Sequence, residues 1–442
     1  MNTPICDFVK QFVNSNPHRL HMPGHKGRIF LNNELYDITE IDGADSLYEA
    51  DGIIKESESN ASEIFGAVTF YSTEGSSQCI KAMLHLICTE AEERPLIWAG
   101  RNAHKSFLSA AVLSDFEIKW LYPANNSSYL SCKIDENLIR NELKNSDRKP
   151  DAVYITSPDY LGNTCDIKAL SEVCHENGIL LLVDNAHGSY QKFLSESLHP
   201  IDLGADMCTD SAHKTLPVLT GGAYLHISKK ASPVFASKAK NALSLFGSTS
   251  PSYLILQSLD MANKTLSETF RDDILQISER IKQIKSELKQ QGFSLIDDEL
   301  LKITIETKKY GYYGYEIAEK LKNENIFCEF YDEDFIVLMP SAYTDKETLD
   351  LLKKVLCNIE RKKEITEIPP SVPKPDKVFS PRQAVFMPSE TISAKESLGR
   401  ILAFSTVGCP PAVPIIAGGE RIDEDVIKCF NYYKVKECTV IK

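Results

Sequence analysis

The sequence predicts an α/β protein, in which a large domain with a mostly parallel central sheet precedes a smaller C-terminal α+β domain. The first observation is a series of short apolar runs that alternate with helix-like stretches from about Ala61 onward. Short buried strands alternating with helices are typical of a parallel sheet covered on both faces. The second observation is the change of pattern after Pro251, where long amphipathic helices follow. The third is the length of 442 residues, which exceeds a single ordinary domain.

The elements of the large domain follow in order along the chain. Residues 1–51 are rich in Gly, Pro, Asn and His, and we expect an irregular N-terminal arm there. Residues 52–255 are expected to form the large domain, with a strand at each apolar run and helices between several of them. The expected strands are Ala67–Tyr71, Leu96–Ala99, Ala152–Thr156, Ile179–Val183 and Ala223–Ile227, and two expected helices are Ser77–Glu90 and Ile167–Asn177.

Residues 256–368 are expected to form the smaller α+β domain. The stretch Arg271–Gln291 places isoleucines and Leu288 on one helical stripe, and Gly292 is a plausible helix end. Residues 369–442 are expected to form a proline-rich linker, around Ile368–Pro375, and a C-terminal segment. The other expected elements are helices over Ser252–Ala262, Gly314–Asn323 and Asp345–Ile359, and strands over Phe293–Thr307 and Ile326–Met339.

Charge and cysteine content limit the class of protein. The chain has 49 Lys and Arg against 62 Asp and Glu, a net charge of −13, which disfavours a nucleic-acid binder because phosphate neutralisation needs a basic face. No apolar stretch approaches the ~20 residues of a membrane span, and the start does not resemble a signal peptide. The 12 cysteines are therefore expected to be reduced thiols in a cytoplasmic protein, and no ligand spacing predicts a metal site.

The most informative stretch for chemistry is Thr209–Leu216, which follows a short apolar run and contains Lys214. A lysine amine held out of bulk solvent at the end of a strand is suited to attack an aldehyde. Ser211 and His213, just before the lysine, could donate hydrogen bonds to a phosphate group beside it. From this stretch alone, an ordinary surface lysine is an equally good interpretation.

A second stretch, Leu180–Val183, is an apolar strand that ends in Asp184. Open α/β sheets bind their ligands at the carboxyl ends of the strands, and a carboxylate there can hold a proton on a pyridine nitrogen. By itself such an aspartate is more often a helix cap or a loop residue. Its occurrence together with Lys214 favours the pyridine partner.

A third stretch is the strand-to-helix turn Ser72–Gln78, where Gly75, Ser76 and Ser77 could bind phosphate at a helix start or simply cap the helix. The turn has neither the P-loop nor the dinucleotide-binding glycine pattern. His104 follows the strand Leu96–Ala99, where its ring could stack on an aromatic cofactor or be an ordinary loop histidine.

Taken together and in this order, several stretches resemble the Orn/Lys/Arg decarboxylase family: HMPGHKG, STEGSSQ, RNAHKS, SPDYLGN, LLVDNAHG, SAHKTLPVLTGGAYLH, STSPSYLILQSLD and PPAVPIIAGGERI. The resemblance covers nearly the whole chain and implies a fold type I enzyme that uses pyridoxal 5'-phosphate, in a compact form without the N-terminal regulatory domain. It also implies decarboxylation of arginine, lysine or ornithine in polyamine metabolism, with arginine favoured, by a cytoplasmic homodimer with shared active sites.

The resemblance further implies a role for each site residue. Lys214 would bind the cofactor covalently, and Asp184 would pair with the pyridine nitrogen. His104 would stack on one face of the ring with Ala186 on the other, and His187 would lie near the ring hydroxyl. Either Lys214 or a nearby histidine would return a proton to Cα. The phosphate would lie among Gly75, Ser76, Ser77, Ser211 and His213, with Ser250 reaching in from the partner subunit.

A basic substrate also needs an acidic partner at the far end of its pocket, and Glu420 is the candidate. The nearby segment Cys409–Pro414 departs from the family, which more often has a tyrosine and a glycine in this turn, so the choice of substrate stays open. One alternative is another reaction of the same cofactor, of the aminotransferase or aldolase type. A second is a catalytically silent regulatory relative, against which the retention of Lys214 and Asp184 counts.

Overall fold

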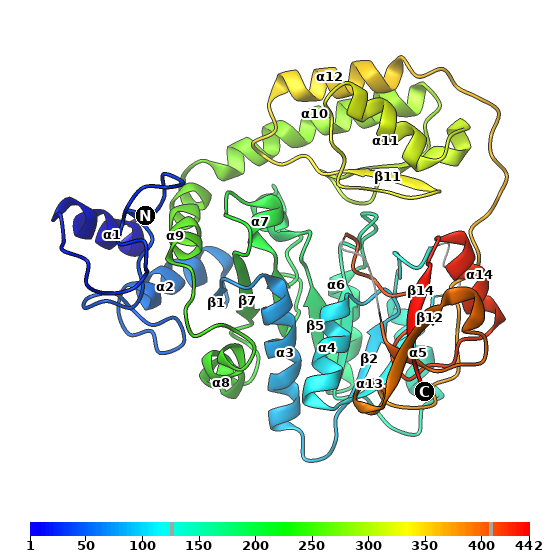
Figure 1. The fold of residues 1–442 in the computed structure, drawn as a ribbon, viewed down its shortest axis with the longest axis horizontal. Coiled ribbons are helices and arrows are strands. Elements are labelled where there is room, and N and C mark those ends of the chain that lie inside the picture. Colours follow the sequence, from blue (N-terminus) through cyan, green and yellow to red (C-terminus); the bar gives the residue numbers. More distant parts are fainter. Residues whose placement is uncertain (124–127, 406–409) are drawn as a thin grey trace. The chain divides into compact units, whose positions relative to one another are not determined.

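The computed structural model describes residues 1–123, 128–405 and 410–442, and it confirms the α/β class (Figure 1). The chain divides into two compact units, and the expected boundaries after residues 51, 255 and 368 stay a prediction. The strands of the central sheet follow the order β1-β7-β6-β5-β4 in the first unit and β4-β2-β3 in the second. The first unit contains Met1–Pro95, Asp151–Tyr154 and Ile167–Asp272, and the second contains Leu96–Pro150, Ile155–Asp166 and Asp273–Lys442.

The sheet of the first unit is parallel except for one reversed strand. Strands β5 and β6 are parallel, whereas β7 is antiparallel to both of its neighbours, β6 and β1. The connection from β6 to β7 therefore begins and ends at the same edge of the sheet. The expected strands are confirmed to within a residue at each end, and β6 had been recognised only as an apolar run. The strands are β1 (Val68–Ser72), β4 (Ala152–Thr156), β5 (Leu180–Asp184), β6 (Met207–Asp210) and β7 (Ala223–Ile227).

The helices of the first unit include one that the composition did not predict. The arm begins with α1, whose residues Ile5 and Val9 are buried and which packs on α2 and α9, so the arm is not wholly irregular. Helix α3 starts directly after Gly75 and covers β6 and β7. The helices are α1 (Pro4–Asn14), α2 (Ile53–Phe65), α3 (Ser76–Glu90), α6 (Ile167–Glu176), α7 (Ala212–Thr215), α8 (Pro233–Ser244) and α9 (Tyr253–Glu268).

The second unit contains a parallel pair of strands and a four-stranded antiparallel sheet. The pair consists of β2 (Leu96–Gly100) and β3 (Glu117–Leu121). In the sequence, α4 (Lys105–Ser114) connects the two strands and α5 (Glu136–Lys144) follows β3. The sheet has the order β10-β11-β9-β8. Helix α10 buries its predicted apolar stripe, since Ile274, Ile281 and Leu288 are each 0% exposed. The remaining elements are α10 (Phe270–Gln290), β8 (Leu295–Ile296), β9 (Ile303–Glu306), α11 (Gly314–Asn323), β10 (Phe330–Tyr331), β11 (Phe335–Leu338) and α12 (Lys346–Cys357).

Two single strands expected in this region are instead hairpins. The stretch Phe293–Thr307 contains β8 and β9, and Ile326–Met339 contains β10 and β11, each pair antiparallel. The acidic runs at residues 297–299 and 332–334 interrupt the apolar pattern. Their side chains stabilise turns, since Glu299 accepts from the backbone N–H of Lys302 and Asp332 from that of Asp334.

The C-terminal segment forms a small sheet of its own with the order β12-β14-β13. Ile422, Val426, Phe430 and Val440 belong to the core beneath it. The connector Ile368–Pro375 has neither helix nor strand, as its proline content predicts. The elements are α13 (Pro381–Phe386), β12 (Ser389–Ser393), β13 (Leu402–Phe404), α14 (Glu424–Tyr432) and β14 (Glu437–Ile441).

Two further observations concern the described residues as a set. None of their helices combines the length and the apolar composition that crossing a bilayer would require. Their cysteines, which do not include Cys409, are all free thiols. Burial raises the pKa of Cys79 and of Cys174 to about 12, which suppresses the reactive thiolate form.

Candidate functional site

Lys214 lies on α7, the single helical turn that follows β6. Its amine nitrogen is 3.0 Å from Nε2 of His187, which follows β5. His187 is 5% exposed, whereas Lys214 is only half-buried. Because β5 and β6 are parallel neighbours, the loops after them meet at one edge of the sheet and bring the two side chains together.

Asp184 is the last residue of β5 and is 2% exposed. The hydroxyl of Tyr154 donates to its Oδ2 at 3.1 Å, and the backbone N–H of Ala186 donates to its Oδ1 at 3.2 Å. Burial raises the pKa of the Asp184 carboxyl, and the Lys214 cation and the Tyr154 hydrogen bond offset part of that rise. Nothing in the sequence pointed to Tyr154, which lies in an apolar strand and resembles an ordinary core residue.

The start of helix α3 offers an anion-binding turn. Gly75 has a φ of 71°, and no atom lies within 4 Å of the place that a Cβ would take, so the space beside it is open. The hydroxyl of Ser211 donates to that of Ser76 at 2.7 Å, and Ser77 follows in the first turn of the helix. Unpaired amides and the helix dipole favour an anion at such a position. The backbone N–H of Gly75 also donates to the carbonyl of Gly221 at 2.7 Å.

His213, beside Lys214, is anchored at one ring nitrogen. Its Nδ1–H donates to the carbonyl of Gly222 at 3.0 Å, which leaves Nε2 as the other functional atom of the ring. Burial lowers the pKa of His213, although the bond to Gly222 acts in the opposite direction. These surroundings therefore favour the neutral ring.

A buried network supports the two loops from below. Asp210 at the end of β6 is 0% exposed, and its Oδ2 accepts from Nε2 of His199 at 3.2 Å and of His226 at 3.3 Å. Its Oδ1 accepts from Asn185 at 2.7 Å, which ties the loop after β5 to β6. Burial alone would raise the pKa of Asp210. The charges and hydrogen bonds of His199 and His226 have the larger, opposite effect, so the pKa lies below its usual value. His199, Cys208 and Asp210 are close enough to hold a metal ion, yet hydrogen bonds already explain the arrangement of Asp210.

In the second unit, His104 is the N-cap residue of α4. Its Nδ1 accepts from the backbone N–H of Ser106 at 3.1 Å and from the Ser106 hydroxyl at 2.9 Å. Because Nδ1 accepts, the hydrogen of the neutral ring is on Nε2. His104 therefore has the hydrogen bonds expected of an ordinary loop histidine, and its stacking on a cofactor stays a prediction.

Glu420 requires a correction. The carboxylate is 3% exposed and forms a bidentate ion pair with Arg101, at 2.8 and 2.7 Å. Its Oε1 also accepts from Nε1 of Trp120 at 3.0 Å, and its Oε2 from the backbone N–H of Ala417 at 2.7 Å. Each oxygen therefore has two donors already, so Glu420 is not the group that meets the basic end of a substrate. Arg101 lies in the RNAHKS stretch, but nothing in the sequence indicated its partner.

Ser250 is exposed in the segment before α9, where its backbone N–H donates to the hydroxyl of Ser248 at 3.1 Å. Ser252 accepts from the N–H of Ile255 and so caps α9, which accounts for one of the polar residues here. The expected contact of Ser250 with the site of a partner subunit stays a prediction.

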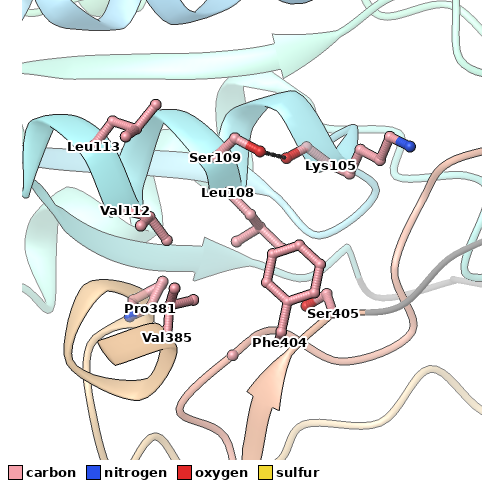
Figure 2. Close-up of a pocket in the computed structure, with 10 residues that line it drawn as sticks. Lys105, Leu108, Ser109, Val112, Leu113, Pro381, Val385, Phe404 and Ser405 are labelled. Carbon is pink, nitrogen blue, oxygen red and sulfur yellow. Dashed lines mark hydrogen bonds between the residues drawn. The ribbon is translucent and has the colours of Figure 1, made fainter. Parts of the chain in front are cut away.

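The second unit also contains a cavity of about 400 Å³ between α4, α13 and β13. Figure 2 shows Leu108 and Val112 facing Pro381, Val385 and Phe404, whereas the amine of Lys105 points away from them. The lining contains none of the predicted site residues and little that could catalyse a reaction. It is a separate, apolar feature.

Comparison with known proteins identifies the chain. The family model "Orn/Lys/Arg decarboxylase, major domain" matches residues 3–334. The chain belongs to this family. Its membership confirms the predicted enzyme class, a pyridoxal-phosphate-dependent amino-acid decarboxylase.

Individual relatives agree with this assignment. An arginine decarboxylase of Halalkalibacterium halodurans is 31% identical over 96% of this chain and 91% of its own length. The uncharacterized protein YaaO of Bacillus subtilis is 30% identical over 97% of this chain and 93% of its own length. The lysine decarboxylase LdcF of Francisella novicida has the same fold, with a TM-score of 0.81 at 17% identity over 100% of this chain and 81% of that one.

Proposed function

We propose that the protein removes CO2 from arginine, in preference to lysine and ornithine, and releases the corresponding amine for polyamine metabolism. The proposal rests on the arrangement of Lys214, His187 and Asp184 within a chain of this family. The arginine decarboxylase relative, which aligns with most of the chain, supports the preference for arginine. We further propose that the enzyme is cytoplasmic. Its acidic composition suits a small cationic substrate.

The residues of the first unit fit pyridoxal 5'-phosphate. The open space beside Gly75, the hydroxyls of Ser76 and Ser211 and the first amides of α3 suit its phosphate. The buried carboxylate of Asp184 suits the pyridine nitrogen, and the amine of Lys214 suits the aldehyde carbon.

When bound, pyridoxal 5'-phosphate supplies an electron sink for the electron pair that departing CO2 leaves on Cα. The carboxylate of Asp184 holds a proton at the pyridine nitrogen, because a buried anion strongly stabilises a neighbouring cation. Lys214 and His187 exchange a proton across their 3.0 Å contact. The lysine can therefore present a neutral amine for attachment. Once the amine of the substrate has displaced it and His187 has given it a proton, it can pass that proton to Cα.

The experiment that tests this function is an assay of the purified protein, loaded with the cofactor, on arginine, lysine and ornithine in turn. We expect CO2 and the amine from arginine at the highest kcat/KM, with no product from the Lys214→Ala variant. Release of a keto acid would instead indicate an aminotransferase, and the absence of product from all three amino acids would exclude the proposal.

We also propose a homodimer in which Ser250 of each chain contributes to the partner's phosphate site. Support comes from the exposure of the segment around Ser250, immediately before α9. Mixing the Lys214→Ala chain with a chain altered at Ser248, Thr249 and Ser250 should restore activity, to about half the normal sites in each mixed dimer. A monomeric mass by light scattering, or a mixture without activity, would exclude shared sites.

A further inference from the structure

We propose that Arg101 and Glu420 are positioning residues, which hold the C-terminal segment against the His104 loop and thereby set the place of the His104 ring. The inference deepens the proposed function in one respect, because it takes His104 to contact the cofactor. Residues that are far apart in the sequence meet here within one unit.

The first observation is the number of contacts that hold the ion pair, although the buried Nε of Arg101 has no hydrogen-bond partner among the described residues. In addition to its two bonds to Glu420, the Nη2 of Arg101 donates to the carbonyl of Ile415 at 3.1 Å. Its guanidinium also lies over the ring of Trp120, 4.8 Å from the centroid. Arg101 is 4% exposed and Glu420 is 3% exposed. A planar guanidinium with these contacts has one orientation, which fixes the backbone that carries it.

The second observation is that the residues around His104 are held on both sides. Arg101 is three residues before it, and the backbone N–H of Lys105, the next residue, donates to the carbonyl of Ala412 at 2.9 Å. Ser106 fixes the ring itself through Nδ1. The segment 412–420 therefore contacts the loop both before and after the histidine.

The third observation concerns the segment that presents Glu420. Gly419 has a φ of 90°, and a Cβ there would lie 2.2 Å from the carbonyl oxygen of Phe379. A Cβ on Gly418 would lie 2.9 Å from the carbonyl oxygen of Ala403. Only glycine suits these two positions. The turn is closed by the bond from the N–H of Ala417 to Glu420, so the carboxylate is also held by its own segment and not by Arg101 alone.

These contacts have a direct consequence for the loop. If the carboxylate is neutralised, Arg101 becomes an unpaired charge in a buried position and its side chain moves toward water. The backbone of residues 101–104 must then move as well, and the His104 ring with it. Loss of the pair thus weakens the cofactor contact without removing any residue from the cofactor site.

The test is a double-mutant cycle on cofactor affinity, with the full-length protein and pyridoxal 5'-phosphate in equilibrium dialysis. The variants are His104→Ala, Glu420→Gln and the combination of the two, with Arg101→Lys as an independent second variant. Glu420→Gln keeps the shape of the carboxyl side chain but removes its charge, whereas Arg101→Lys keeps the charge but removes the two-pronged guanidinium. Circular dichroism checks that each variant is folded. The matched control is Glu390→Gln, which breaks the exposed 2.8 Å pair of Glu390 with Arg400 in the same unit.

We expect His104→Ala, Glu420→Gln and Arg101→Lys each to raise the dissociation constant by about tenfold, with no change in the control. In the His104→Ala background, Glu420→Gln should add nothing, because its effect passes through the ring. Additive effects in the cycle, or full cofactor affinity in Glu420→Gln and Arg101→Lys, would overturn the inference. An unchanged affinity in His104→Ala would overturn the stacking role as well, whereas the product assay tests the proposed function separately.

A second readout does not require the cofactor. The ring nitrogens of His104 can be followed by NMR in the cofactor-free protein, with His104→Ala providing the assignment. We expect Glu420→Gln to change the Nδ1 and Nε2 shifts, because the hydrogen bonds to Ser106 change when the loop moves. Shifts identical to those of the wild type would contradict the inference.

Discussion

The loop after β5 in the first unit and the loop after β2 in the second unit each lie beside a cluster of charged and imidazole side chains. The carboxylates of the two clusters, Asp184 and Glu420, differ in their surroundings. In the first loop, Asp184 is buried with a raised pKa, and the Lys214 amine beside His187 remains half-buried. At the second loop, each oxygen of Glu420 accepts from two donors. The guanidinium of Arg101 is paired with Glu420 and lies over the ring of Trp120. A buried carboxylate with a raised pKa is suited to take part in a reaction. A carboxylate whose oxygens all have hydrogen-bond donors is suited to hold the surrounding structure in place.

This difference can be measured, because the two carboxylates should respond to neutralisation in opposite ways. Removing the charge of Asp184 should stabilise the fold and greatly lower the activity, as is typical of functional groups kept in unfavourable surroundings. Removing the charge of Glu420 should destabilise the fold, because it leaves Arg101 without its partner.

The largest expected effect is that of Lys214→Ala, which should abolish decarboxylation because no other group can attach the cofactor at that place. Borohydride reduction of the loaded wild-type protein should leave the cofactor on the peptide that contains Lys214, as identified by mass spectrometry. The exposed Lys230→Ala variant serves as the control and should keep both the activity and the label. Recovery of the label on another lysine would contradict the assignment.

The next largest effect is expected for Asp184→Asn. We predict a fall in kcat of about 10³-fold, since the amide cannot hold a proton on the pyridine nitrogen. The cofactor-free variant should be about 1 kcal/mol more stable at pH 7, because burial raises the pKa of Asp184 and its ionised form costs stability.

The sign of this stability difference gives a control within the same experiment. A carboxyl with a raised pKa contributes its stability at low pH and loses it as the pH rises above the ordinary value of 3.8 through the folded-state value. Urea unfolding at pH 4 and pH 7 should therefore show a smaller advantage of Asp184→Asn at pH 4. An advantage that grows on acidification, or more than a tenth of the wild-type activity, would refute this interpretation of Asp184.

The third effect is on stability. Glu420→Ala should lower the free energy of unfolding by about 3–5 kcal/mol, because it leaves a buried guanidinium without its partner. Urea unfolding followed by circular dichroism would measure this loss. Glu390→Ala removes a carboxylate whose side chain is 42% exposed and should leave the unfolding curve unchanged. Equal curves for the two variants would remove the distinction drawn here between the two loops.

The smallest effect is expected at the phosphate turn. Ser76→Ala removes the acceptor of the 2.7 Å bond from Ser211 and one hydroxyl from the anion site, so cofactor affinity should fall by about tenfold or less. Equilibrium dialysis would measure this change, with the exposed Ser59→Ala as control. An unchanged dissociation constant would place the phosphate elsewhere.

How much the sequence could predict depends on the range of the interactions. Lys214 and Asp184 each directly follow a strand, so local pattern and the rule for sheet edges were enough to bring them together. The contact between Arg101 and Glu420 joins residues 319 positions apart. The spacing of apolar residues along the sequence cannot predict a contact between residues so far apart. The same limit applies to Tyr154, whose hydroxyl gains its partner only when β4 and β5 lie side by side in the sheet.

The reversed strand β7 has a consequence for the order in which the fold is acquired. Pairing β6 with β7 closes a loop of only about a dozen residues, which includes Lys214, whereas pairing β7 with β1 joins Ile227 to Val68. Short loops close at a lower entropic cost and therefore sooner. The lysine segment thus takes shape on an early hairpin, and the phosphate turn that follows β1 reaches it late. Uptake of the cofactor by a refolding chain would then report the completion of the sheet rather than its beginning.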